Sequence, residues 1–159
     1  MNQMDVRSIS SKAKQYCPIS SAAEVMADHW SVIILRDIAI CNQRTFGSIL
    51  ANNNENISTG TLANRLKRMS DLGLLTVIKD PAHSQRKIYC LSSKAIELIP
   101  ILIDMSIWAL KHASPSPESN LVPRDMESSP STYAKNLVEQ LQSTHLFPAE
   151  DQKNNGADA

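Results

Sequence analysis

Apolar and polar positions recur with a helical period between residues 57 and 75. One set of positions spaced by four and three residues is apolar, and it consists of Leu62, Leu66, Met69 and Leu72. The positions on or beside the other face are mostly polar or basic, and they include Gly60, Thr61, Asn64, Lys67 and Arg68. Such spacing places each set on its own face of a helix. The segment therefore predicts an amphipathic helix that packs on one side and can meet an anion on the other.

The sequence also marks the ends of this helix. Ser58 or Thr59 can cap its N-terminus, because a hydroxyl oxygen accepts a hydrogen bond from an otherwise unpaired backbone amide. Gly73 can adopt the left-handed conformation that commonly ends a helix. The predicted helix therefore begins at Ser58 or Thr59 and ends before Gly73.

Three further helices are predicted upstream. Pro18 suits the first turn of one helix, and a strongly apolar helix follows over residues 30–41. Thr45 can cap a short helix over residues 46–50. The asparagine-rich run 52–56 is typical of a turn. The short helix and the helix after this turn are therefore expected to form a helix-turn-helix pair.

A hairpin is predicted after Gly73. Residues 74–79 and 86–91 contain β-branched, aliphatic and aromatic side chains, and the polar loop between them contains Pro81. Two short strands separated by a polar loop are typical of a β-hairpin. The order of elements up to residue 91 is therefore helix, helix, helix-turn-helix and hairpin.

A last long helix should follow the hairpin, capped by Ser92 or Ser93. Pro100 should kink this helix or restart it, because proline cannot donate the backbone hydrogen bond of a helix interior. Its apolar surface is wider than the exterior of a small domain needs, and the expected partner is a second copy of the chain. The predicted dimer contacts are Ile103, Ile107 and Trp108.

The chain is expected to divide near residue 113. Residues 1–113 should form the folded domain, with residues 1–16 as a short helix or an arm that contacts a partner. Residues 114–159 should form a linker and an acidic tail, with a short helix around residues 131–147. This division follows from the serine- and proline-rich composition after residue 113.

The net charge of zero conceals an uneven distribution. Residues 1–113 hold 13 basic and 9 acidic residues, whereas residues 114–159 hold 3 and 7. Between Arg44 and Lys87 there are seven basic residues against three acidic ones. A local basic excess suits a face that binds phosphate, although a merely solvated charged face accounts for many such clusters. Charge alone therefore leaves both interpretations open.

Membrane, metal and cofactor sites are not indicated. No stretch approaches the roughly 20 apolar residues of a membrane span, and no signal-peptide pattern begins the chain, so we expect a cytoplasmic protein. The three cysteines are too widely spaced for a disulfide framework or a metal motif. Cys41 and Cys90 lie on apolar patterns and are interpreted as core residues. The four histidines have no ligand spacing, so no metal and no cofactor is expected.

An ordered series of residues over about 17–112 points to a known family. It comprises Cys17-Pro18-Ile19, Trp30, Ile34-Leu35-Arg36-Asp37, Arg44-Thr45-Phe46, Ile57-Ser58, Leu62, Arg65-Leu66, Gly73-Leu74, Pro81, Arg86, Tyr89 and Leu91. The series resembles the HxlR family of bacterial transcriptional regulators, within the broad MarR-like superfamily. The glycine and lysine usual before the tryptophan are Asp28 and His29 here, and the prolines usual before the wing arginine are Ser84 and Gln85. These departures do not alter the expected topology.

The resemblance implies a mainly α protein with a small β-hairpin, of the α+β class. The implied fold is a winged helix-turn-helix with additional N- and C-terminal dimerisation helices, and residues 1–113 are expected to form it. It also implies a sequence-specific regulator that binds a two-fold operator in double-stranded DNA as a homodimer, with one recognition helix per subunit in successive major grooves. The expected DNA-binding residues are Arg44, Ser58, Thr59, Thr61, Asn64, Arg65, Lys67, Arg68, Arg86 and Lys87.

Chemistry suggests how these residues share the task. Hydroxyls and amides at the start of the recognition helix suit phosphates, and Lys67 suits a phosphate as well. Asn64 and Arg68 have the donor geometry for base edges. Arg65 lies at the edge of the apolar stripe, so it can either read bases or brace the fold. Both roles for Arg65 stay open.

Cys17 is a candidate redox sensor. It directly precedes Pro18 at a predicted helix start, where the helix dipole stabilises a thiolate. The resembled family includes sensors of oxidants and electrophiles that use a cysteine in this region. The alternative is a small buried side chain near the dimer interface. Candidate effectors are therefore an oxidant or a small molecule, the latter in a pocket between the long helix and the second helix.

Two other classes of function are weighed against a regulator. A winged-helix module that binds a protein partner and no specific DNA could use the acidic tail, but the local basic excess argues against it. A thiol enzyme built on Cys17 lacks an evident base nearby in sequence, so no catalytic residue is assigned. We therefore predict a regulator that is not an enzyme.

Overall fold

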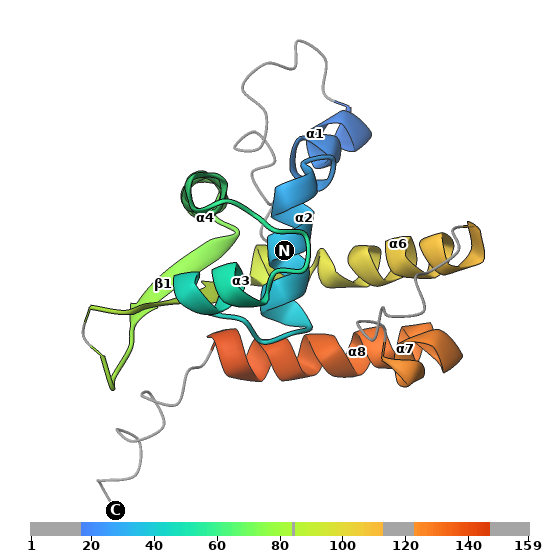
Figure 1. The fold of residues 1–159 in the computed structure, drawn as a ribbon. Coiled ribbons are helices and arrows are strands. Elements are labelled where there is room, and N and C mark those ends of the chain that lie inside the picture. The colour runs from blue at the N-terminus through green and yellow to red at the C-terminus, as the bar shows by residue number, and fades with distance from the viewer. Residues whose placement is uncertain (1–16, 84, 113–122, 147–159) are drawn as a thin grey trace, which may run out of the picture. The chain divides into compact units, whose positions relative to one another are not determined.

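The computed structural model describes residues 17–83, 85–112 and 123–146, and its ribbon is drawn in Figure 1. The chain forms two units that divide between Tyr89 and Cys90. The arm expected over residues 1–16 lies outside the described residues.

The first unit holds the predicted helices and the hairpin. In chain order it contains α1 (Pro18–Met26), α2 (His29–Ala39), α3 (Phe46–Asn52), α4 (Thr59–Asp71), β1 (Leu75–Lys79) and the start of β2 (Lys87–Leu91). The two strands pair as a two-stranded sheet. The backbone of Thr45, just before α3, adds an antiparallel bridge to Ile88 of β2. The predicted winged helix-turn-helix with its small hairpin is thus confirmed.

Polar side chains fix where the helices of the first unit begin. Asp28 caps α2, Thr45 caps α3 within a capping box, and Ser58 caps α4. Of the two caps expected for α4, Ser58 is the one used: its Oγ accepts a hydrogen bond from the Thr61 amide at 3.2 Å. Thr59 is the first residue of the helix itself.

Gly73 ends α4 as expected. Its φ is +69°, a left-handed value that glycine adopts without steric cost. The Leu74 amide donates to the Met69 carbonyl and the Gly73 amide donates to the Ser70 carbonyl, both at 2.9 Å. This pair of bonds is a Schellman motif, in which the residue after the glycine is commonly apolar and packed. Leu74 is accordingly 1% exposed and leads directly into β1.

Helix α2 lies at the centre of the core of the first unit. It contacts α1, α3 and α4. The fully buried side chains of this unit come from α2, α3, α4 and the residue before β1, and they include Ile34, Leu35, Ile38, Ile49, Leu62, Met69 and Leu74. The apolar pattern over residues 30–41 therefore did predict the central helix.

The second unit is helical. It contains the end of β2, α5 (Ser93–Ile96), α6 (Ile99–His112), α7 (Arg124–Ser128), α8 (Pro130–Leu141) and the π-helical turn η2 (Gln142–Leu146). Helices α6 and α8 lie side by side (Figure 1), and α8 also contacts α7 and η2. Pro100 is the second residue of α6, so the predicted long helix restarts at this proline. In the described part of the chain, no helix is long and apolar enough to cross a membrane.

Two helices occupy the described part of the expected linker and tail. Residues 124–128 were expected within the linker, but they form α7, which buries Met126 to 2% exposure. A single apolar anchor among polar residues gives no periodicity, so the sequence pattern could not reveal this helix. Helix α8 falls within the segment 131–147 apart from its first residue, with Leu137 and Leu141 buried. The functional division expected at residue 113 stays a prediction.

Candidate nucleic-acid interface

Helix α4 presents a polar face to solvent opposite its buried apolar face. Leu62, Leu66 and Met69 are at most 2% exposed. The exposed positions of the helix are Thr59, Gly60, Ala63, Asn64, Lys67 and Asp71, and the period of an α-helix puts all of them on one side. No atom outside the helix backbone and the neighbouring residues lies within 4 Å of a Cβ added at Gly60. Because Gly60 and Ala63 are small, a partner can approach the helix backbone closely along this face.

The first turn of α4 is suited to an anion. Ser58 and Thr59 are exposed, and the Ser58 hydroxyl donates to the Thr61 hydroxyl oxygen at 2.8 Å. The first amides of an α-helix have no partner within the helix, and the helix dipole makes this end electropositive. Thr59 and Gly60 therefore offer backbone donors beside the hydroxyl groups.

The two arginines of α4 point back toward the start of the first unit. The Arg65 Nε lies 3.1 Å from the Asp28 Oδ2, and the side chains are 30% and 17% exposed. This Nε is buried and makes no hydrogen bond, so the contact is an ion pair without hydrogen-bond geometry. The Arg68 Nη2 donates to the backbone carbonyl of Glu24 in α1 at 3.0 Å. Both arginines thus connect α4 to the α1–α2 segment.

Lys67 and Asn64 have more freedom. The Lys67 Nζ lies 2.6 Å from the Asp71 Oδ2, and these side chains are 76% and 62% exposed. An exposed pair of this kind is weak, because water and salt screen it. Asn64 is exposed and makes no side-chain hydrogen bond within the described residues. Either side chain can therefore turn to a new partner at little cost.

A partly buried polar network holds the turn between α3 and α4. Arg36 of α2 donates to both carboxylate oxygens of Glu55, at 2.6 and 2.9 Å, and also pairs with Asp37. Asp37 is 3% exposed and accepts a hydrogen bond from the Asn53 Nδ2 at 3.0 Å. Asn53 in turn accepts one from the Ile57 amide at 3.1 Å. The turn that sets the direction of α4 is thus anchored to α2.

The contact with Arg36 favours the ionised form of the Glu55 carboxyl. Hydrogen bonds from Arg36 hold the pKa of the Glu55 carboxyl below its usual value. No pattern in the sequence indicates this network, because Arg36 and Glu55 lie 19 positions apart. Arg36 was singled out only as part of a family signature, without a role.

The loop end of the hairpin carries two of the other expected basic residues, Arg86 and Lys87. Arg86 forms an ion pair with Asp80, and the Ala82 amide donates to the Asp80 Oδ1 at 2.8 Å. The Ala82 amide and then Arg86 lower the pKa of the Asp80 carboxyl. Lys87 is exposed at the start of β2.

Arg44 joins the segment before α3 to this hairpin. Its carbonyl accepts from the Tyr89 amide at 2.7 Å, and its Nε donates to the Tyr89 carbonyl at 3.4 Å. A surface groove of about 630 Å³ lies beside this contact, lined by Thr45, Phe46, Gly47, Ser48, Gln85, Arg86, Lys87 and Tyr89. The fold thus brings Arg86 and Lys87 to the start of α3, a proximity that the sequence pattern could not predict.

Comparison with known protein families assigns the chain to a family. A family model described as HxlR-like helix-turn-helix matches residues 25–117, which is more than half of the chain. The chain belongs to the HxlR-like helix-turn-helix family. This is a family of transcription regulators and not of enzymes.

Individual relatives agree with the family. The uncharacterized HTH-type transcriptional regulator sll1512 from Synechocystis sp. is 30% identical over 89 residues, which are 56% of this chain and 64% of sll1512. The chain therefore spans just under two thirds of that relative. The crystal structure of PA1607, described as a candidate transcription factor, is similar with a TM-score of 0.62 at 27% identity. That similarity covers 73% of this chain and 80% of PA1607.

The cysteines of this HxlR-like chain lie in three different environments. Cys17 is exposed directly before α1, Cys41 is partly buried, and Cys90 is buried. Burial raises the pKa of the Cys41 thiol. Of the three, Cys17 is therefore the thiol that a reagent in solution can reach most readily. Within the described residues, no group of three or more histidine, cysteine or acidic side chains is arranged to hold a metal ion.

Helix α6 has an exposed apolar face. Ile103, one of the expected dimer contacts, is 1% exposed and is buried within the chain. Ile107 is partly exposed and Trp108 is 66% exposed. Ile101 and Met105, which the sequence did not single out, are 47% and 45% exposed and share a helix face with Trp108. Only the helix register in the structure separates these residues from the buried ones, because α6 is apolar on most sides.

Proposed function

We propose that this HxlR-like chain is a sequence-specific transcriptional regulator that binds double-stranded DNA as a homodimer on a two-fold operator. The observation that carries the proposal is the exposed face of α4. It is polar, its first turn suits an anion, and its small residues Gly60 and Ala63 permit close approach. An α-helix with such a face fits the major groove of DNA.

Within this proposal, Asn64 contacts a base edge. The side-chain amide of asparagine can donate to and accept from adenine at the same time. Thr59 and the amides beside it bind a phosphate, with Ser58 and Thr61 completing the polar helix start. Lys67 exchanges its weak pair with Asp71 for a phosphate.

The two arginines of α4 take different roles. Arg65 positions α4, because its Nε is buried against Asp28 and is not directed toward solvent. Arg68 anchors the helix through the Glu24 carbonyl and also contacts DNA. A guanidinium has five N–H donors, so one bond to a carbonyl leaves donors for a phosphate or a base.

The hairpin supplies backbone contacts. Arg86 and Lys87 line the groove next to the start of α3, and Arg44 contacts Tyr89 in the middle of β2. We assign these three side chains to phosphates of the DNA backbone, where contacts fix the position of a protein on the duplex. Each phosphate contact adds affinity that is independent of base sequence and sensitive to salt.

The homodimer uses the exposed face of α6. Trp108 is the central anchor, flanked by Ile101 and Met105 with Ile107 at the edge. Large exposed apolar side chains grouped on one helix favour burial against an identical surface. Ile103 supports this face from within the chain. A regulator of this kind acts where the chromosome is, so the cytoplasmic location expected from the sequence is part of the proposal.

Cys17 makes the regulator responsive to oxidants or electrophiles. Its exposure and its position before Pro18 at a helix start support this role. The test is operator binding before and after mild oxidation, compared between the native chain and Cys17→Ser. Loss or gain of binding in the native chain alone is expected. Identical responses of the two proteins would remove Cys17 from the mechanism.

The central test is selection of bound duplexes from random DNA. We expect a two-fold motif whose half-sites are about one helical turn, roughly 34 Å, apart. Asn64→Ala should relax the preference at one base position in each half-site. For Lys67→Ala and Arg68→Ala, the control for loss of a positive charge is Lys94→Ala, on α5. Recovery of no motif, together with unchanged duplex affinity in Lys67→Ala and Arg68→Ala, would favour a protein-interaction module instead.

A further inference from the structure

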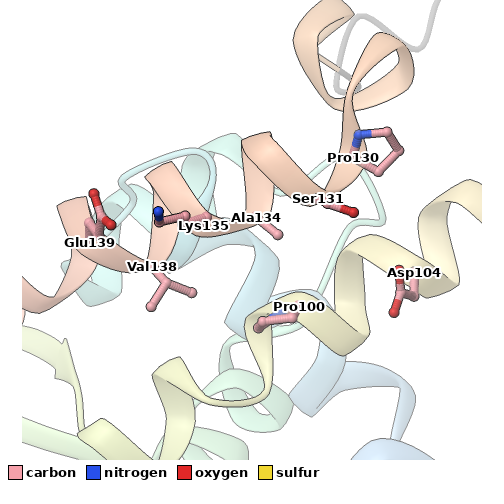
Figure 2. Close-up of a pocket in the computed structure, with 8 residues that line it drawn as sticks. All are labelled: Pro100, Asp104, Pro130, Ser131, Ala134, Lys135, Val138 and Glu139. Atoms are coloured by element: carbon pink, nitrogen blue, oxygen red, sulfur yellow. The ribbon is translucent and has the colours of Figure 1, made fainter.

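A second surface feature lies in the second unit, between α6 and α8. It is a groove of about 490 Å³ lined by Pro100, Asp104, Pro130, Ser131, Ala134, Lys135, Val138 and Glu139 (Figure 2). Its volume lies within the roughly 300–1,000 Å³ of small-molecule sites. None of the functions proposed above uses this groove.

The floor of the groove is apolar. Figure 2 shows Val138 and Ala134 of α8 beside Pro100 of α6, and the exposed lining is mostly apolar surface. Pro100 lies here because α6 restarts at this residue, and its ring adds an apolar surface at the helix start. A floor of this kind favours the burial of a short hydrocarbon body.

The charges at the rim are not balanced. Lys135 and Glu139 stand one helical turn apart on α8 and carry opposite charges. Asp104 of α6 is exposed at the end of the groove near Ser131 and Pro130 (Figure 2). It makes no hydrogen bond or ion pair with any described residue. Two carboxylates and one ammonium give the groove a net negative charge, and Asp104 is the carboxylate at the end away from Lys135 (Figure 2).

We propose that this groove binds a small organic amine with an apolar body. The hydrocarbon part lies against Val138, Ala134 and Pro100, and the ammonium group donates hydrogen bonds to the Asp104 carboxylate. Ser131 supplies a hydroxyl oxygen as a further acceptor at the same end. An anionic ligand of the same size would have to meet two carboxylates for the one ammonium of Lys135. Charge complementarity thus selects a cation.

The probe for this proposal is hexylamine, titrated into the full chain at neutral pH and followed by amide NMR shifts. Saturable shifts are expected at residues of α6 and α8 around the groove. Hexanoate and hexanol provide the matched ligands with the same hydrocarbon body and a negative charge or no charge. We expect both to bind at least several-fold more weakly than hexylamine.

Variants separate the contribution of the Asp104 charge to amine binding from the contribution of the apolar floor. Asp104→Asn should weaken hexylamine binding about tenfold, the order expected for a hydrogen-bonded charge pair at a partly exposed site. Ala134→Leu fills the floor and should abolish binding. Glu127→Gln, at an exposed position of α7 outside the groove, is the matched control for loss of a carboxylate and should bind as the native chain does. Non-saturating shifts, equal binding of hexanoate, or unchanged binding in Asp104→Asn would overturn the proposal. Because operator binding plays no part in this readout, its outcome is independent of the proposed DNA-binding function.

Discussion

The Arg36 guanidinium and the Glu55 carboxylate form a two-point ion pair, with N–O distances of 2.6 and 2.9 Å. The pair joins α2 to the turn between α3 and α4, and the same guanidinium also holds the buried Asp37. The direction of α4 therefore depends on a partly buried side chain of α2 and not only on the turn itself.

Removal of this guanidinium should destabilise the fold. Arg36→Ala leaves Asp37 buried with only the Asn53 amide as a side-chain partner, and loss of about 2–4 kcal/mol in the free energy of unfolding is expected. Urea denaturation measures this value. Lys79→Ala, at the exposed end of β1, is the control for loss of a positive charge and should change it little. Equal stability of the two variants would contradict the importance of the network.

The pH dependence of stability should report on Glu55. Its pKa is lowered in the folded state by the hydrogen bonds from Arg36, so the folded protein favours the ionised carboxylate. This contribution is fully present above the unfolded pKa of about 4.3, and it is lost as the pH falls through the lower folded pKa. Glu55→Gln should therefore lower stability at neutral pH and show a smaller further loss on acidification. Unfolding free energies between neutral and acidic pH that run parallel in the two proteins would refute this assignment.

Arg65 and Asp28 should act on DNA binding as a unit. Arg65→Gln and Asp28→Asn should weaken operator binding by similar factors, and the double variant should be no worse than either single one. Asparagine at position 28 retains the helix cap, so only the charge is removed. Fluorescence anisotropy with operator variants provides the measurement.

A direct DNA contact by Arg65 would give a different result. Loss of a phosphate contact flattens the salt dependence of log K by about one unit, as we expect for Lys87→Gln. Loss of a base contact changes preference at a single base position by about 1–3 kcal/mol. If Arg65→Gln produced either result while Asp28→Asn did not, Arg65 would contact DNA directly.

Gly60 should separate stability from DNA binding. Space around its Cβ position is open, so Gly60→Ala should stabilise the chain by up to about 1 kcal/mol. Gly60→Leu fits the free protein equally well but occupies the space through which DNA would approach α4. We expect it to retain thermal stability while operator affinity falls at least tenfold. Full operator affinity in Gly60→Leu would mean that this face of α4 does not enter the major groove of DNA.

Trp108 should control the oligomeric state. Trp108→Ser replaces the largest exposed apolar side chain of α6 and should shift sedimentation toward the monomer. Trp30→Phe, a conservative change of the other tryptophan, serves as the control and should leave the oligomeric state unchanged. A native chain that sediments as a monomer at all concentrations would contradict the dimer.

Features that depend on local chemistry were predictable from the sequence. Thr45 as a cap, Gly73 as a helix end and the restart at Pro100 follow from the conformational preferences of single residues. The apolar stripe of α4 follows from helical period. Each of these signals lies within a few positions of the structure that it predicts.

Features that depend on contacts between distant segments were not predictable. The Arg36–Glu55 pair spans 19 positions, and the Arg68 contact with the Glu24 carbonyl spans 44. Ile103 and Met105 are equally apolar in sequence, but only the packing of α6 makes the first buried and the second exposed. Helical period identifies a face only when the opposite face is polar, and α6 has no such contrast.

Asp28 has a consequence for attempts to move DNA specificity between relatives. This residue caps α2 and also faces Arg65 of α4, although the position is usually glycine in the family that the sequence resembles. A chimera that received only residues 58–72 on a scaffold with glycine at position 28 would leave Arg65 without its acidic neighbour, and the contact that we propose positions α4 would be lost. Transfer of the operator preference therefore requires a donor segment that begins before α2.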